Sequence, residues 1–277
     1  MNFDFAAALV IATLLTGLIW AADVLWGVPR RRAAAARLAA QGDEGLADAA
    51  AAQAALKEPV LVEYAKSFFP VILAVLLLRS FVVEPFRIPS QSMMPTLLVG
   101  DFILVNKFDY GLRLPVVDWK ILPIGEPHRG DVAVFRYPRD PSVDYIKRIV
   151  GLPGDHIAYY NKTLYINGKE MKQVDDGSYM GVGAGVSMSG AKLRTEDLDG
   201  VKHHILTLPN VTGLSGDYVV PKGQYFVMGD NRDNSNDSRY WGTVPERDLV
   251  GKAFVVWMNW DPSNGGIGWS RIGTAIH

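Results

Sequence analysis

The chain has 277 residues, enough for one sizeable domain with membrane segments or for two small domains. Lys and Arg total 28 and Asp and Glu total 29, so no net charge indicates a nucleic-acid partner. Cysteine is absent, which excludes a disulfide framework, a thiolate nucleophile and a cysteine-bound metal. The histidines show no metal-ligand spacing, and we interpret His203 and His204 as ordinary polar residues.

The first element in chain order is an uncharged apolar run, Phe5–Ala22, which is long enough to cross a bilayer. A cleaved signal peptide is the alternative. It does not fit the flanks, because Asp4 precedes the run and the basic residues follow it, at Arg30, Arg31, Arg32 and Arg37. The positive-inside rule keeps these arginines in the cytoplasm and places the N-terminus outside. Residues 1–28 are therefore predicted to be a membrane anchor.

Residues 29–66 are alanine-rich and are predicted to form a solvated cytoplasmic helix or a mobile linker. A second apolar run covers residues 67–83, and its single charge, Arg79, can reach the headgroups by snorkelling. A buried core helix is the alternative reading. Lys57 and Lys66 before the run, and a large polar region after it, favour a second transmembrane helix. Residues 84–277 would then lie outside the cytoplasm.

The remaining sequence is typical of β structure. Short β-branched or aromatic runs are punctuated by Gly, Pro, Asn and Asp, as at Asn167-Gly168. The predicted strands cover residues 102–108, 131–137, 145–150, 156–160, 163–166, 225–228 and 253–257. The glycine-rich residues 180–190 are predicted to form a flexible surface excursion. The fold class is therefore mainly β, preceded by two membrane helices.

Residues 84–95 follow the second apolar run directly and contain three prolines. Each proline fixes its own φ and disfavours helix at the residue before it, so this segment is predicted to be extended. Alternation then places Phe86, Ile88, Ser90 and Ser92 on one face. A turn leaving a membrane helix is the alternative for an isolated Ser-x-Ser. A hydroxyl nucleophile in this segment would act close to the bilayer surface.

A serine nucleophile requires a base, and no histidine lies in a motif-like setting. The predicted strand around residues 144–150 offers Lys147, on the same face as Tyr145 and Ile149. A strand lysine that reaches water is the alternative. To act as a base, Lys147 must be neutral, and lowering its pKa to about 7–8 requires destabilising the ammonium by about 3–4 kcal/mol. Desolvation on an apolar face can supply that energy.

A dense polar loop covers residues 229–239. A calcium loop is excluded, because the positions that need a ligand, a glycine and a glutamate are filled by Arg232, Ser235 and Trp241. A solvated turn remains an alternative. A hydrogen-bonded network that supports a catalytic site accounts better for the density of acids, amides and arginines.

Four segments together resemble the successive signature boxes of bacterial type I signal peptidases (leader peptidases): residues 88–97, 129–135, 144–155 and 229–239. The resemblance runs from about residue 81 to residue 276, and the two predicted spans fit the Gram-negative members. It implies an all-β catalytic core with a smaller β extension, here at about residues 161–219. That extension is short and lacks the cysteine pair of some relatives.

The resemblance also implies roles for individual residues. Ser92 would be the nucleophile and Lys147 the general base, with the oxyanion held by the Ser92 backbone N–H and the Ser90 hydroxyl. Ser235 would orient the Lys147 amine, while the site would be supported by Asp237, Arg239 and Asp230. The substrate pockets would be lined by Phe86, Ile88, Leu97, Tyr145 and Ile146. No metal or cofactor is implied.

The predicted function is therefore a membrane-bound serine endopeptidase that removes signal peptides from exported preproteins after Ala-x-Ala-like sites. It would lie in the inner membrane, near the secretion translocon, with the catalytic domain in the periplasm. Two alternatives remain. A Ser–Lys self-cleaving protein would need a DNA-binding helix-turn-helix in place of the spans, and a non-catalytic membrane-tethered β domain would not depend on Ser92.

Overall fold

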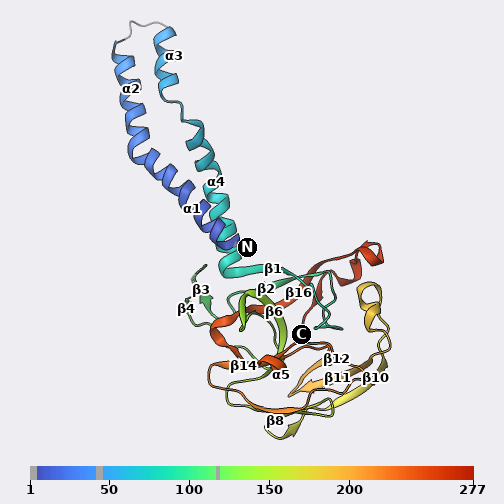
Figure 1. Cartoon of the computed structure of the whole chain (residues 1–277). Coiled ribbons are helices and arrows are strands. Elements are labelled where there is room, and N and C mark those ends of the chain that lie inside the picture. The colour runs from blue at the N-terminus through green and yellow to red at the C-terminus, as the bar shows by residue number, and fades with distance from the viewer. Residues whose placement is uncertain (1–4, 42–45, 117–118) are drawn as a thin grey trace. The chain divides into compact units, whose positions relative to one another are not determined.

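The computed structural model describes residues 5–41, 46–116 and 119–277 (Figure 1). The chain divides into two compact units, an N-terminal helical unit that ends at Ser80 and a β unit formed mainly from Phe81 onwards.

In residues 5–41 and 46–82 the structure has four α-helices and two π-helical segments. These are α1 (Phe5–Ala22), η1 (Asp23–Gly27), α2 (Val28–Gln41), α3 (Leu46–Ala55), α4 (Val60–Leu77) and η2 (Leu78–Val82), of which the last runs into the β unit. Two continuous helical stretches, Phe5–Ala40 and Val60–Val82, are long and apolar enough to cross a membrane. The second helix begins at Val60, earlier than the predicted residue 67. The helix starts after Pro59, which is extended (φ −60°, ψ 141°). The apolar run in the sequence covers only the part of this helix that is compatible with lipid.

Helices α1 and α4 lie side by side and pack closely through a small residue. A Cβ on Gly17 would lie 2.8 Å from the Phe69 ring, so only glycine allows this approach. The Phe69 ring also packs against Trp20, with 5.6 Å between the ring centroids.

The β unit is built around a nine-stranded sheet with the order β1-β2-β16-β5-β6-β14-β15, in which β17 and β18 also pair with β16. All of these pairings are antiparallel. The strands are β1 (Val83–Arg87), β2 (Asp101–Asn106), β5 (Val132–Tyr137), β6 (Asp140–Gly151), β14 (Gln224–Met228), β15 (Val244–Pro245), β16 (Leu249–Asp261), β17 (Gly266–Ile267) and β18 (Thr274–Ala275).

Three smaller sheets complete the unit, with the orders β3-β4, β13-β7-β8-β9 and β10-β11-β12. Their strands are β3 (Leu112–Arg113), β4 (Lys120–Leu122), β7 (His156–Tyr160), β8 (Thr163–Ile166), β9 (Lys169–Glu170), β10 (Gln173–Ser178), β11 (Lys192–Leu198), β12 (Val201–Thr207) and β13 (Gly216–Val219). The short helices are η3 (Gly183–Met188), α5 (Ser238–Trp241), η4 (Glu246–Asp248), η5 (Pro262–Asn264) and η6 (Trp269–Arg271).

The mainly β fold is confirmed, and each of the seven predicted strands coincides with or overlaps an observed one. The hairpin formed by β11 and β12 was not predicted. Its turn, Asp199-Gly200, has positive φ at both residues (53° and 101°), the geometry that the Asn167-Gly168 turn also adopts. The Asp-Gly pair is typical of a hairpin turn, but the polar sequence of β11 did not indicate a strand.

Residues 180–190, predicted to be a flexible surface excursion, do lie at the surface, where Met180, Val182 and Val186 are exposed. Residues Gly183–Met188 form η3, and the Ala184 amide donates to Asp261 Oδ2 at 2.6 Å. The Met188 side chain is buried in an apolar cluster with Met94 and Leu206. Burial of Met188 anchors one end of η3, which glycine content alone could not reveal.

Besides a third cluster around Phe135 and Ile149, two apolar clusters hold the main sheet in place. One packs Ile103 and Val105 of β2 against Ile146 of β6. The other joins the main sheet to the β7–β8 hairpin, since Phe226 packs with Tyr159 and other buried residues. Strand β6 contributes to both clusters, so it is held from two sides at the centre of the unit.

Candidate active site

Ser92 lies in a tight turn that follows β1. The predicted extended conformation is observed through Ile88 and is wrong from Gln91 onwards, where two main-chain hydrogen bonds of 3.1 and 3.0 Å close the turn. The side chains of Met93, Met94 and Leu97 are fully buried there. Because an extended strand would turn alternate side chains to opposite faces, burial of these neighbours favours the turn. We call residues 90–97 the nucleophile turn.

The two hydroxyls of this turn lie close together. Ser90 Oγ is 3.3 Å from Ser92 Oγ. Ser92 is only 8% exposed, whereas Ser90 is exposed. One hydroxyl is therefore held in the protein interior and the other lies at its edge.

The amine of Lys147 reaches Ser92 from β6. Its Nζ lies 2.8 Å from Ser92 Oγ and donates to the Ile146 carbonyl, also at 2.8 Å. The side chain is 4% exposed, and Nζ lies 5.3 Å from the centre of the Tyr145 ring, on the face that alternation predicts. Burial lowers the pKa of Lys147 to about 8, although the negative charges of Asp237 and Asp230 oppose the shift. A substantial neutral fraction therefore exists near neutral pH.

The polar loop 229–239 is braced by one of its own carboxylates. Asp237 forms an ion pair with Arg239, with Nη2 and Oδ2 2.7 Å apart, and also accepts from the Gly229 amide at 3.0 Å. Arg239 Nη2 donates to the Arg232 carbonyl at 2.6 Å. These contacts tie both ends of the loop together, as the density of polar residues predicted.

Asp230 connects this loop to β6 and to the nucleophile turn. Arg148 donates to both of its carboxylate oxygens, at 2.8 and 2.7 Å, and the Thr96 hydroxyl donates to it at 2.5 Å. Although burial raises the pKa of Asp230, the charge and hydrogen bonds of Arg148 bring it below its ordinary value. Asp230 is thus ionised, and both of its carboxylate oxygens have hydrogen-bond partners that connect loop 229–239 to β6 and to the nucleophile turn.

The model of the family described as signal peptidase, peptidase S26, matches residues 61–260. The chain is 50% identical to signal peptidase I of Pseudomonas fluorescens, over 94% of each chain. It is 49% identical to signal peptidase I of Pseudomonas aeruginosa, over the full length of both. It is 40% identical to signal peptidase I of Aquifex aeolicus, over 68% of this chain and 81% of that one.

The chain belongs to the peptidase S26 family of signal peptidases. The resemblance to bacterial type I signal peptidases is therefore confirmed. The positions of the remaining residues can be compared with that family assignment.

Four of the five expected pocket residues share one apolar cluster: Phe86, Ile88, Leu97 and Ile146. Tyr145 packs elsewhere, stacked on Tyr137 with 4.4 Å between ring centroids. Ile88 and Leu97 are 2% and 0% exposed, so they can form only the floor of a pocket. An incoming side chain would meet mainly the half-buried Phe86 and Tyr145.

Ser235 does not make the contact expected of it. Its Oγ is buried and has no hydrogen-bond partner among the described residues. It lies instead beside Gly229, where a Cβ would be 2.2 Å from Ser235 Oγ and 2.4 Å from the Ser92 carbonyl oxygen. Sequence reasoning missed Gly229, which is the residue that lets loop 229–239 approach the nucleophile turn.

We expect Gly229→Ala to destabilise the protein by about 1–3 kcal/mol, because the added methyl group must displace Ser92 or Ser235. Turnover should fall as well, since the displaced group includes the backbone of Ser92. Thermal unfolding and peptide cleavage would measure both effects. Gly213→Ala is the matched control, because its Cβ would meet no backbone atom and only the side chains of Lys162 and Asp233, at 3.3 and 3.6 Å. Equal effects of the two substitutions would contradict this view.

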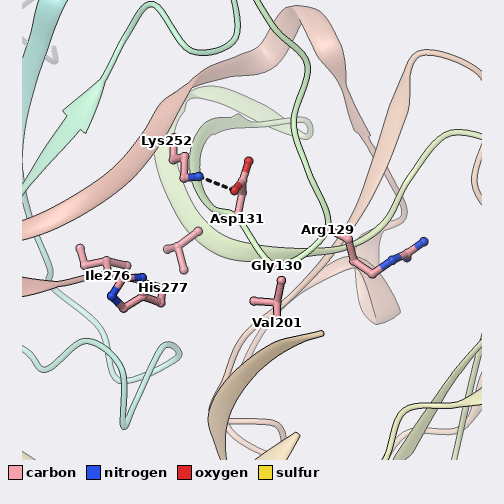
Figure 2. A pocket seen from close by; sticks show the side chains of 8 residues that line it. Arg129, Gly130, Asp131, Val201, Lys252, Ile276 and His277 are labelled. Atoms are coloured by element: carbon pink, nitrogen blue, oxygen red, sulfur yellow. Dashed lines mark ion pairs between the residues drawn. The ribbon is translucent and has the colours of Figure 1, made fainter. Parts of the chain in front are cut away.

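A pocket of about 180 Å³ lies apart from Ser92 and Lys147 (Figure 2). Its lining includes Arg129, Lys252 and Asp131, and Figure 2 shows Lys252 facing Asp131, with Nζ and Oδ1 2.7 Å apart. Arg129 is paired with Asp155 at 3.1 Å. All three charged groups have partners, so the pocket does not compete with the Ser92 site. Within residues 5–41, 46–116 and 119–277, no three His, Asp or Glu side chains are placed to hold a metal ion.

Proposed function

We propose that this signal peptidase homologue is a membrane-bound serine endopeptidase with Ser92 as nucleophile and Lys147 as general base. The observation that carries the proposal is the 2.8 Å separation of Lys147 Nζ and Ser92 Oγ in a buried setting. That distance lies within the range in which a base can take a proton directly. The lowered pKa of Lys147 supports the same assignment.

In the first step the neutral Lys147 amine takes the Ser92 hydroxyl proton as Oγ attacks the scissile carbonyl carbon. The oxygen of that carbonyl becomes negatively charged. The Ser92 backbone N–H and the Ser90 hydroxyl would stabilise this charge, which the proximity of the two serines supports. Lys147, now an ammonium, then gives its proton to the leaving amine, and an acyl group remains on Ser92.

In the second step water attacks the acyl group. Lys147 again serves as the base, taking a proton from water, and returns it to Ser92 Oγ when the ester breaks. Asp237, Arg239 and Asp230 would act by holding the site rigid.

The substrates would be exported preproteins cleaved after Ala-x-Ala-like sequences. Ile88 and Leu97 are almost completely buried, so a pocket over them would be shallow, which supports selection of small side chains before the cleaved bond. Phe86, Tyr145 and Ile146 would form the walls. An extra methylene would have to displace packed side chains, at a cost of about 1–3 kcal/mol.

We also propose an inner-membrane location with the catalytic unit in the periplasm. Two apolar helices that could span a membrane support the anchoring. The basic residues Arg30, Arg31, Arg32 and Arg37 support a cytoplasmic position for the segment between the spans. The bilayer and, on the periplasmic side, the secretion translocon would then be neighbours of the enzyme.

The topology predicts a clear labelling pattern. Because the native chain has no cysteine, Val174→Cys in β10 and Ala39→Cys in α2 can each be labelled singly, and both positions are exposed. A membrane-impermeant maleimide added to spheroplasts should label Val174→Cys at once and Ala39→Cys only after lysis. The reverse pattern would contradict the proposed topology and the periplasmic location.

Cleavage of a purified preprotein tests the function itself. The detergent-solubilised wild-type protein should release the mature chain after the Ala-x-Ala-like site, and Ser92→Ala should not. A non-catalytic tethered domain would leave the preprotein intact in both cases. A self-cleaving protein would instead cut its own chain and ignore the preprotein.

A further inference from the structure

A buried group of charges links the β11–β12 hairpin to loop 229–239. Glu196 of β11 and Arg232 of the loop are 0% and 1% exposed. Arg232 Nη1 donates to Glu196 Oε1 at 2.7 Å, and Nη2 donates to the second carboxylate oxygen. Gln173 of β10 donates to the same carboxylate at 3.0 Å. The pair is therefore bidentate, and its carboxylate is also held by a side chain of a second strand.

His203 of β12 lies against this pair, and its interpretation as an ordinary polar residue was wrong. It is 6% exposed, with Nε2 3.5 Å from Glu196 Oε2 and 3.8 Å from Asp230 Oδ1. Burial, followed by the positive charge of Arg148, lowers the pKa of His203 to about 4. The imidazole is thus neutral at pH 7. The charged groups around it therefore pair with one another, Glu196 with Arg232 and Asp230 with Arg148.

Main-chain hydrogen bonds continue from this cluster to the nucleophile turn. The Leu206 amide of β12 donates to the Asp230 carbonyl at 2.9 Å, and the Arg232 amide donates to the Leu206 carbonyl at 3.0 Å. Between these bonds, the Asn231 amide donates to the Ser92 carbonyl at 3.1 Å. The residues that border Asn231 are thus held by the hairpin, and Asn231 holds Ser92.

We propose that Glu196 is a positioning residue for Ser92, acting through Arg232 and Asn231. The proposal rests on the function assigned to Ser92 above. Without the Glu196 carboxylate, a buried guanidinium loses its counter-ion, and Arg232 loses the side-chain contact that ties loop 229–239 to β11. A displacement of about 1 Å at a reacting group can cost about 10²-fold in rate. Because Glu196 is fully buried, it does not contact substrate, and the effect should fall on kcat.

Glu196→Gln keeps the shape of the side chain and removes its charge. At a temperature where near-ultraviolet circular dichroism shows folded protein, we expect kcat to fall by about 10–10²-fold with KM within about twofold. Amide hydrogen exchange in peptides covering residues 90–97 should become faster, although Glu196 lies far from them in sequence. Glu170→Gln, an exposed acid in β9, should change neither quantity.

A folded Glu196→Gln protein with wild-type kcat would overturn the proposal, even if its melting temperature were lower. Lost activity with unchanged exchange at residues 90–97 would overturn it too. If this variant does not fold, Glu196→Asp, which keeps the charge but shortens the reach, is judged by the same two criteria. The exchange measurement needs no substrate. A wild-type protein that cleaves no preprotein would therefore refute the proposed function, while exchange would still decide the link to Ser92.

Discussion

Lys147→Arg should abolish preprotein cleavage, with a loss of at least about 10⁴-fold in kcat, and Ser92→Ala should do the same. A guanidinium retains its proton at any accessible pH and cannot serve as a base, although it preserves the positive charge. Initial cleavage rates with purified variants would measure the loss.

Lys169→Arg is the matched control, because Lys169 is an exposed lysine paired with Asp199. It should leave the rate unchanged. Circular dichroism should show that Lys147→Arg remains folded. An active Lys147→Arg enzyme would contradict the assignment of Lys147 as the base, whatever the behaviour of Ser92→Ala.

Ser90→Ala should lower kcat by about 10²–10³-fold while KM changes little, because the Ser90 hydroxyl would bind an oxyanion that exists only during the reaction. Its Oγ lies 3.3 Å from Ser92 Oγ, close enough for both groups to meet the same carbonyl. Ser187→Ala, on the surface of η3, is the control. Comparable losses in substrate affinity and in turnover would show that Ser90 binds substrate instead.

The sequence was sufficient to predict that Lys147 lies beside Ser92, because two kinds of information agreed. Strand alternation placed Lys147 on the apolar face with Tyr145, and the family resemblance paired it with Ser92. The same local reasoning failed beyond Ser90, because the three prolines predicted an extended chain where the structure has a turn. The turn depends on burial of Met93 and Met94 against residues distant in sequence, which local propensity does not contain.

The interactions that surround Ser92 and Lys147 were only partly predictable from the sequence. The ion pair of Asp237 and Arg239 is local and followed from the signature box. The pairing of Glu196 with Arg232 joins residues 36 positions apart, the first in the β11–β12 hairpin and the second in loop 229–239. Nothing in the composition of β11 distinguishes this buried glutamate from a solvated one, and only the fold shows where its charge is compensated.

The pH dependence of kcat/KM tests the central claim, a buried lysine that is neutral enough to act as a base. In the free enzyme the protonated form of Lys147 is inactive, so activity should rise with pH as the proton is lost. Because burial lowers the pKa of Lys147 to about 8, the half-maximal value should lie near that pH. The claim would be contradicted if kcat/KM kept rising to about pH 10.4, the pKa of an unperturbed lysine. It would also be contradicted if kcat/KM did not rise with pH at all.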